Sequence, residues 1–144
     1  MIRVKKILYS TDFSSYSTHA YFHAVGLAEA FGAELTLLFA YSAATDDPPR
    51  GRDFWREQLL QTRPANHAIA VSHVFLEGDA ATEIVRHATA VGTDLIVLGT
   101  HGRSGADRLL MGSVAERVMR AAPCSVTVVK MPRARVIEPV VAGG

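Results

Sequence analysis

Short apolar runs alternate along this chain with longer segments whose apolar residues recur at helical spacing. The clearest run spans residues 94–98, where Leu-Ile-Val-Leu follows Asp94, as expected of a strand that is buried on both faces. Comparable runs at 4–9 and 34–41 are joined to helical segments by short polar turns. Strands and helices that alternate in this way form a parallel sheet with helices on both faces. The chain is therefore predicted to adopt an α/β fold.

The remaining predicted elements complete this pattern. Residues 70–77 and 125–130 are expected to form two further strands. Helices are expected where Ser or Asp, which cap helix N-termini well, precedes apolar residues at helical spacing and Gly or Pro follows. With 144 residues, no internal repeat and no sign of a second domain, one domain is expected. The helices would begin at Ser14, Asp79 and Ser113, with a shorter one over 52–62.

The charge balance and the cysteine count argue against several classes of protein. The chain carries 15 Lys and Arg residues against 14 Asp and Glu, so it lacks the basic excess of a dedicated nucleic-acid binder. Cys124 is the only cysteine, so no internal disulfide can form and a reducing compartment is expected. No apolar run approaches the ~20 residues that span a membrane, and residues 7–9 are too short a run for a signal peptide. We expect a cytoplasmic protein that binds neither nucleic acid nor a membrane.

A glycine-rich segment follows the strand predicted at 94–98. It reads GTHGRSGADRLLMGS and lacks the Gly-Lys pair of a Walker loop. It also follows the fourth strand, whereas a dinucleotide fingerprint follows the first. The amides of Gly112, Ser113 and Val114 would nevertheless lie at a helix N-terminus, where unpaired N–H groups and the helix dipole favour an anion. The segment is therefore a candidate phosphate site.

Two turns at the carboxyl ends of the predicted strands carry residues suited to a ligand. One is Ser10-Thr11-Asp12, and the other is the segment that starts at Gly99, in which Arg103 and Arg108 could supply positive charge. In parallel α/β folds, ligands bind beyond the carboxyl ends of the strands, at the point where the strand order reverses. The two turns are thus expected to face one site.

The glycine-rich segment also carries a resemblance to a known family. Gly99-Thr100-His101-Gly102, nine further residues and then Gly112-Ser113 resemble the motif of the universal stress protein family. The segments KKILYSTDFSSYS, EGDAATEIVRHATAVGTDLIVLGTHGRSG and GSVAERVMRAAPCSVTVVK agree with that family in order and spacing, over roughly residues 2–130. The resemblance implies a three-layer α/β/α sandwich whose five parallel strands have the order 3-2-1-4-5. Strands one and four, which precede the two polar turns, are neighbours in that order.

The same resemblance implies a function. The branch of the family that carries the motif binds ATP and usually dimerises, so the chain would be a dimeric stress-response module that binds ATP, with Mg²⁺, AMP or ADP as further ligands. Residues 1–130 would form the nucleotide-binding domain, strand 125–130 the dimer edge, and 131–144 a tail that could extend the dimer contact. The implied site residues are Ser10, Thr11 and Asp12 toward the adenosine, Phe39 and Ala40 beside the adenine, Leu98, Gly99, His101, Gly102 and Arg103 around ribose and phosphates, and Gly112, Ser113, Val114 and Ala115 at the phosphate chain.

Other functions stay open at this point. A slow adenine-nucleotide hydrolase, or a protein that phosphorylates itself on Ser113, could use the same scaffold, although no catalytic triad is identifiable and only Asp12 and Ser113 could hold magnesium or position water. A dimer that has lost nucleotide binding is a third candidate, because residues 41–70 are shorter and richer in proline than is usual in the family. His19 and His23 are four residues apart but lack a nearby third ligand, so no metal site is expected.

Overall fold

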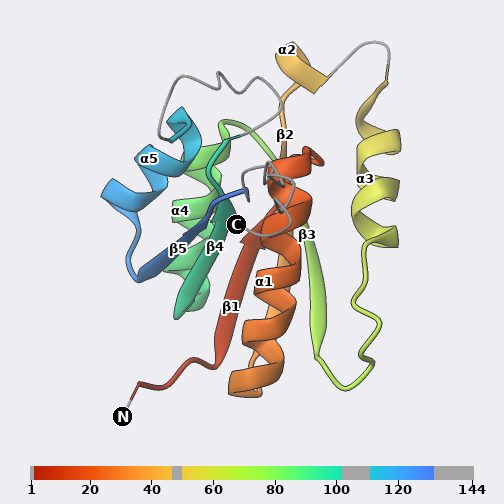
Figure 1. The fold of residues 1–144 in the computed structure, drawn as a ribbon. Helices are drawn as coiled ribbons and strands as arrows, with labels where there is room; N and C mark the ends of the chain where they lie inside the picture. Colours follow the sequence, from red (N-terminus) through yellow and green to blue (C-terminus); the bar gives the residue numbers. More distant parts are fainter. Residues whose placement is uncertain (1, 47–49, 102–110, 132–144) are drawn as a thin grey trace, which may run out of the picture.

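The protein is built around one parallel sheet of five strands in the order β3-β2-β1-β4-β5 (Figure 1). The computed structural model describes residues 2–46, 50–101 and 111–131. Every neighbouring pair of strands is parallel. The predicted α/β class and the strand order implied by the resemblance are confirmed. The strands are β1 (Lys6–Ser10), β2 (Glu34–Tyr41), β3 (Val71–Glu77), β4 (Leu95–Gly99) and β5 (Ser125–Val129).

Helices cover both faces of the sheet, which makes three layers (Figure 1). The long helix α1 (Ser15–Phe31) and α3 (Arg52–Gln61) pack on one face, and α4 (Ala80–Val91) and α5 (Ser113–Ala121) pack on the other. A four-residue helix, α2 (Ala43–Asp46), follows β2 and was not predicted. No helix within the described residues is long and apolar enough to cross a bilayer.

Successive side chains along a strand point to opposite faces, and the core divides accordingly. On β2, Leu37 and Phe39 belong to the cluster under α1 and α3, whereas Leu38 belongs to the cluster under α4 and α5. Trp55 of α3 stacks on Phe39 with ring centroids 5.7 Å apart. Trp55 therefore packs α3 onto the sheet.

The helix caps agree with the sequence except at α5. The Ser14 side chain accepts a hydrogen bond from the Ser17 N–H, and Asp79 accepts one from the Thr82 N–H, as predicted. At α5 the N-cap is Gly112, with φ −72° and ψ 164°, so the prediction that Ser113 caps this helix is wrong. The Gly112 N–H donates to the Thr100 carbonyl at 2.6 Å, and with Gly112 as the cap the helix starts one residue earlier than expected.

Candidate functional site

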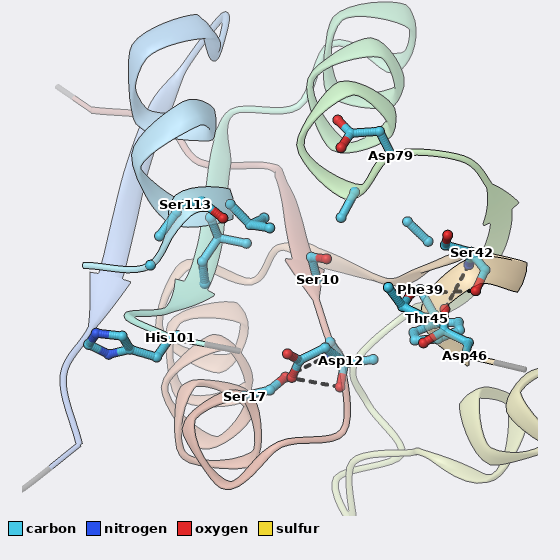
Figure 2. A pocket seen from close by; sticks show the side chains of 18 of the residues that line it. Ser10, Asp12, Ser17, Phe39, Ser42, Thr45, Asp46, Asp79, His101 and Ser113 are labelled. Carbon is cyan, nitrogen blue, oxygen red and sulfur yellow. Dashed lines mark hydrogen bonds between the residues drawn. The ribbon is translucent and has the colours of Figure 1, made fainter. Parts of the chain in front are cut away.

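A pocket of about 710 Å³ opens at the carboxyl ends of β1, β2 and β4, where α4 and α5 begin (Figure 2). Its size is within the range of small-molecule and cofactor sites. Every predicted site residue that the structure describes lines it, while Gly102 and Arg103 lie outside the described residues, as does Arg108. Whether these residues contact a ligand stays a prediction. They are Ser10, Thr11, Asp12, Phe39, Ala40, Leu98, Gly99, His101, Gly112, Ser113, Val114 and Ala115.

The pocket also has walls that the sequence reading missed. The turn after β2 and the turn before α4 reach the same edge of the sheet as β1 and β4, because all the strands are parallel. The sheet topology is the signal that could have identified these two turns as pocket walls. The sequence predicts a ligand role only for the turns that follow β1 and β4. The additional lining residues are Ser17, Ser42, Thr45, Asp46, Gly78, Asp79, Ala80 and Thr100.

A buried network of hydroxyl groups holds the turn after β1. The Tyr9 hydroxyl lies 2.5 Å from the Ser17 carbonyl oxygen and 2.7 Å from Ser17 Oγ, and Ser17 Oγ donates to Thr11 Oγ1 at 2.9 Å. These three side chains are at most 7% exposed. Burial raises the pKa of Tyr9 to about 12, so its hydroxyl stays protonated at neutral pH. The network ties the first turn of α1 to the turn that carries Asp12.

Asp12 itself is placed by local bonds and by its neighbour. Its Oδ1 accepts a hydrogen bond from the Ser14 N–H at 3.0 Å. Phe13 has φ 64°, a left-handed conformation that is uncommon for a bulky residue. The Phe13 ring packs against Phe39 and Trp55, with ring centroids 5.2 and 5.5 Å apart. These aromatic contacts compensate for the unfavourable backbone and hold Asp12 at the pocket.

Gly99 also has a packing role, which the prediction that it contacts a ligand did not include. A Cβ atom at this position would lie 2.9 Å from the carbonyl carbon and oxygen of Tyr16 and 3.2 Å from the Ser17 nitrogen. These are backbone atoms in the first turn of α1, which cannot move without moving the helix. Glycine at this position therefore allows α1 to pack directly on the end of β4.

The N-terminus of α5 forms another wall of the pocket. The Gly112 amide is already used, since it donates to the Thr100 carbonyl, so the expectation that it serves an anion needs correction. Ser113, Val114 and Ala115 lie in the first turn of this helix and line the pocket. Their N–H groups are among the first four of the helix, which have no intrahelical acceptor. They remain the anion-binding groups that this wall can offer.

A pair of charged residues joins α5 to α4 beside this wall. Arg117 donates from Nη1 to Asp79 Oδ1 at 3.0 Å and from Nη2 to Asp79 Oδ2 at 2.7 Å. Asp79 also caps α4 through the Thr82 N–H. Hydrogen bonds from Arg117, and then from Thr82, hold the pKa of Asp79 well below its usual range. The carboxylate is therefore ionised at neutral pH.

The rings of His19 and His23 lie with their centroids 5.2 Å apart on α1. Within residues 2–46, 50–101 and 111–131, no group of three His, Cys, Asp or Glu side chains is placed to hold a metal ion.

Comparison with known proteins places this architecture in a family. The model of the universal stress protein family matches residues 3–130. The chain belongs to the universal stress protein family. Universal stress protein MJ0531 of Methanocaldococcus jannaschii is 35% identical over 142 residues, a match that covers 90% of this chain and 84% of that protein.

Solved universal stress proteins share the fold. UspA from Lactobacillus plantarum aligns with a TM-score of 0.75 and 25% identity, over 90% of this chain and 99% of its own. A universal stress protein solved in complex with cAMP aligns with a TM-score of 0.70 and 24% identity, over 90% of this chain and 98% of its own. One from Archaeoglobus fulgidus in complex with dAMP aligns with a TM-score of 0.59 and 20% identity, over 89% and 98%. At these lower identities, the likeness establishes the fold alone.

Proposed function

We propose that this universal stress protein binds ATP in the pocket of Figure 2 and acts as a dimeric stress-response module. One observation carries the proposal: a single pocket joins the polar turn of Asp12 to the N-terminus of α5. The turn of Asp12 offers a carboxylate that can accept hydrogen bonds from ribose hydroxyl groups or from the amino group of the base. The N-terminus of α5 offers amides for phosphate. Family members of this fold have been solved with cAMP and dAMP, which are adenine nucleotides.

The proposed orientation follows from the chemistry of the two ends. The phosphates lie at Ser113, Val114 and Ala115, and the adenosine lies toward Asp12 and Ala40. Ala40 lies on the face of β2 that packs against α4. Because its side chain is small, it leaves room for a flat base. Phe39 points the other way, into the cluster under α1 and α3, so its side chain supports the wall from behind. AMP and ADP would occupy the same positions, and magnesium would accompany the phosphates.

We place the dimer contact on β5. This strand is at the edge of the sheet, where unpaired backbone groups can accept a second strand. The tail at 131–144, the candidate extension of this contact, lies outside the described residues apart from Met131. Sedimentation velocity tests the arrangement, and a species that stays monomeric at high concentration would contradict it.

Calorimetric titration with ATP tests the nucleotide site. We expect saturable binding to the wild-type protein and none to Gly112→Val, because a β-branched side chain at the start of α5 would occupy the space beside the amides. The control is Gly26→Ala, in the middle of α1, where an added Cβ meets nothing within 4 Å. This variant should bind ATP like the wild type. If the wild-type protein shows neither binding heat nor a thermal shift at millimolar ATP, the proposal is wrong.

A further inference from the structure

The described wall of the pocket is acidic. Its Asp and Glu residues are Asp12, Asp46 and Asp79, and none of the described lining residues is Lys or Arg. Carboxylates near a phosphate group repel it, and this repulsion extends to about 10 Å at 0.1 M salt. Within the described part of the pocket, a group that balances some of this negative charge favours the binding of a ligand with several phosphates.

Arg117 is placed to balance the charge of Asp79. It lies one turn beyond Ser113 on α5 and reaches across to α4 with two hydrogen bonds of 3.0 and 2.7 Å to the carboxylate. Such bidentate pairs fix the guanidinium and the carboxylate in one geometry. Asp79 lines the pocket, whereas Arg117 is not among the lining residues and so contacts the carboxylate from outside. Asp79 is ionised, so its charge is countered by the guanidinium and not by a proton.

We propose that Arg117 is a positioning residue that masks the charge of Asp79 and so allows the pocket to accept a triphosphate as well as a monophosphate. The inference rests on the nucleotide binding proposed above. Repulsion by an unmasked carboxylate grows with the charge of the ligand. Removal of the guanidinium should therefore weaken the binding of ATP more than that of AMP. The ratio of the ATP affinity to the AMP affinity measures how far Arg117 neutralises the charge of Asp79.

The test compares ATP and AMP affinities by calorimetry in the full chain. In Arg117→Gln we expect the ATP-to-AMP affinity ratio to fall by about three- to tenfold. This is the size expected when one negative charge is unmasked at about 10 Å from the phosphates in a partly screened site. In the double variant Asp79→Asn with Arg117→Gln the ratio should return toward the wild-type value. Asn still caps α4, but the link to α5 stays broken, so a role of Arg117 in structure alone would leave the double variant as impaired as the single one.

The matched control is Arg52→Gln. Arg52 pairs with Glu77, and their side chains are 49% and 53% exposed, against 53% and 52% for Arg117 and Asp79. Neither Arg52 nor Glu77 lines the pocket, so this variant loses the same charge and should keep the ratio. The effect of Arg117→Gln should also shrink in 1 M salt, where the Debye length is about 3 Å.

The outcomes separate the two proposals. If the wild-type protein binds neither nucleotide, the proposed function fails and the inference with it. If both nucleotides bind and Arg117→Gln leaves their ratio unchanged, or if the double variant is not rescued, the inference fails while nucleotide binding stands.

Discussion

Replacement of Gly99 by alanine is expected to strain the contact between α1 and β4. The added Cβ would lie 2.9 Å from the backbone carbon and oxygen of Tyr16, well inside ordinary van der Waals contact. The first turn of α1 must then shift by several tenths of an ångström, and overpacking of this kind costs about 1–3 kcal/mol. Alanine also lowers the conformational entropy of the unfolded chain, which stabilises the folded protein by about 0.4–1 kcal/mol. We expect a net loss of about 1–2 kcal/mol in the free energy of unfolding.

Urea denaturation of Gly99→Ala and Gly26→Ala measures this effect with an internal reference. Gly26 lies inside the 17-residue helix α1, and an added Cβ there meets nothing within 4 Å, so alanine should stabilise the protein by about 0.5–1 kcal/mol. Alanine is thus expected to lower the free energy of unfolding at position 99 and to raise it at position 26. The slopes of the denaturation curves should be similar in the two variants. A Gly99→Ala protein as stable as the wild type would refute the packing argument.

Two pH-dependent effects on stability follow from the described ionisable groups. Because the pKa of Tyr9 is raised to about 12 in the folded protein, from about 10 unfolded, its contribution is fully present below about pH 10 and is lost as the pH rises through 12. That loss amounts to roughly 3 kcal/mol. In Tyr9→Phe the free energy of unfolding should therefore fall less over this alkaline range than in the wild type, and an equal fall would contradict the assignment. Because the pKa of Asp79 is lowered, its contribution is present above about pH 4 and is lost as the pH falls below that value. Urea midpoints should therefore fall less between about pH 5 and 3 in Arg117→Gln than in the wild type, and an equal fall would contradict the pairing.

Local patterns were enough to predict most of the elements. Residues 95–98 are buried on both faces of the sheet, as their composition indicates. Ser14 and Asp79 cap their helices because their side chains satisfy N–H groups of the first turn. The strand order was implied by the family resemblance and did not follow from periodicity. Side-chain patterns record which residues are buried but not which strands are neighbours.

The misjudged features depend on contacts between distant residues. Gly112 and Ser113 are both good N-cap residues, and the bond from the Gly112 N–H to the Thr100 carbonyl decides between them. The left-handed φ of Phe13 is unexpected for a phenylalanine and depends on rings from β2 and α3. Asp79 was predicted as a helix cap, but its place in the pocket wall follows from the sheet topology. Local sequence carries no signal for such tertiary contacts.

The central claim is that one pocket binds adenine nucleotides through the turn of Asp12 and the N-terminus of α5. Calorimetric titration of the nucleotide-free protein with ATP tests it most directly. We predict saturable binding that Gly112→Val abolishes and Gly26→Ala preserves, with both variants folded. Absence of binding to the wild-type protein at millimolar ATP, or undiminished binding to Gly112→Val, would contradict the claim.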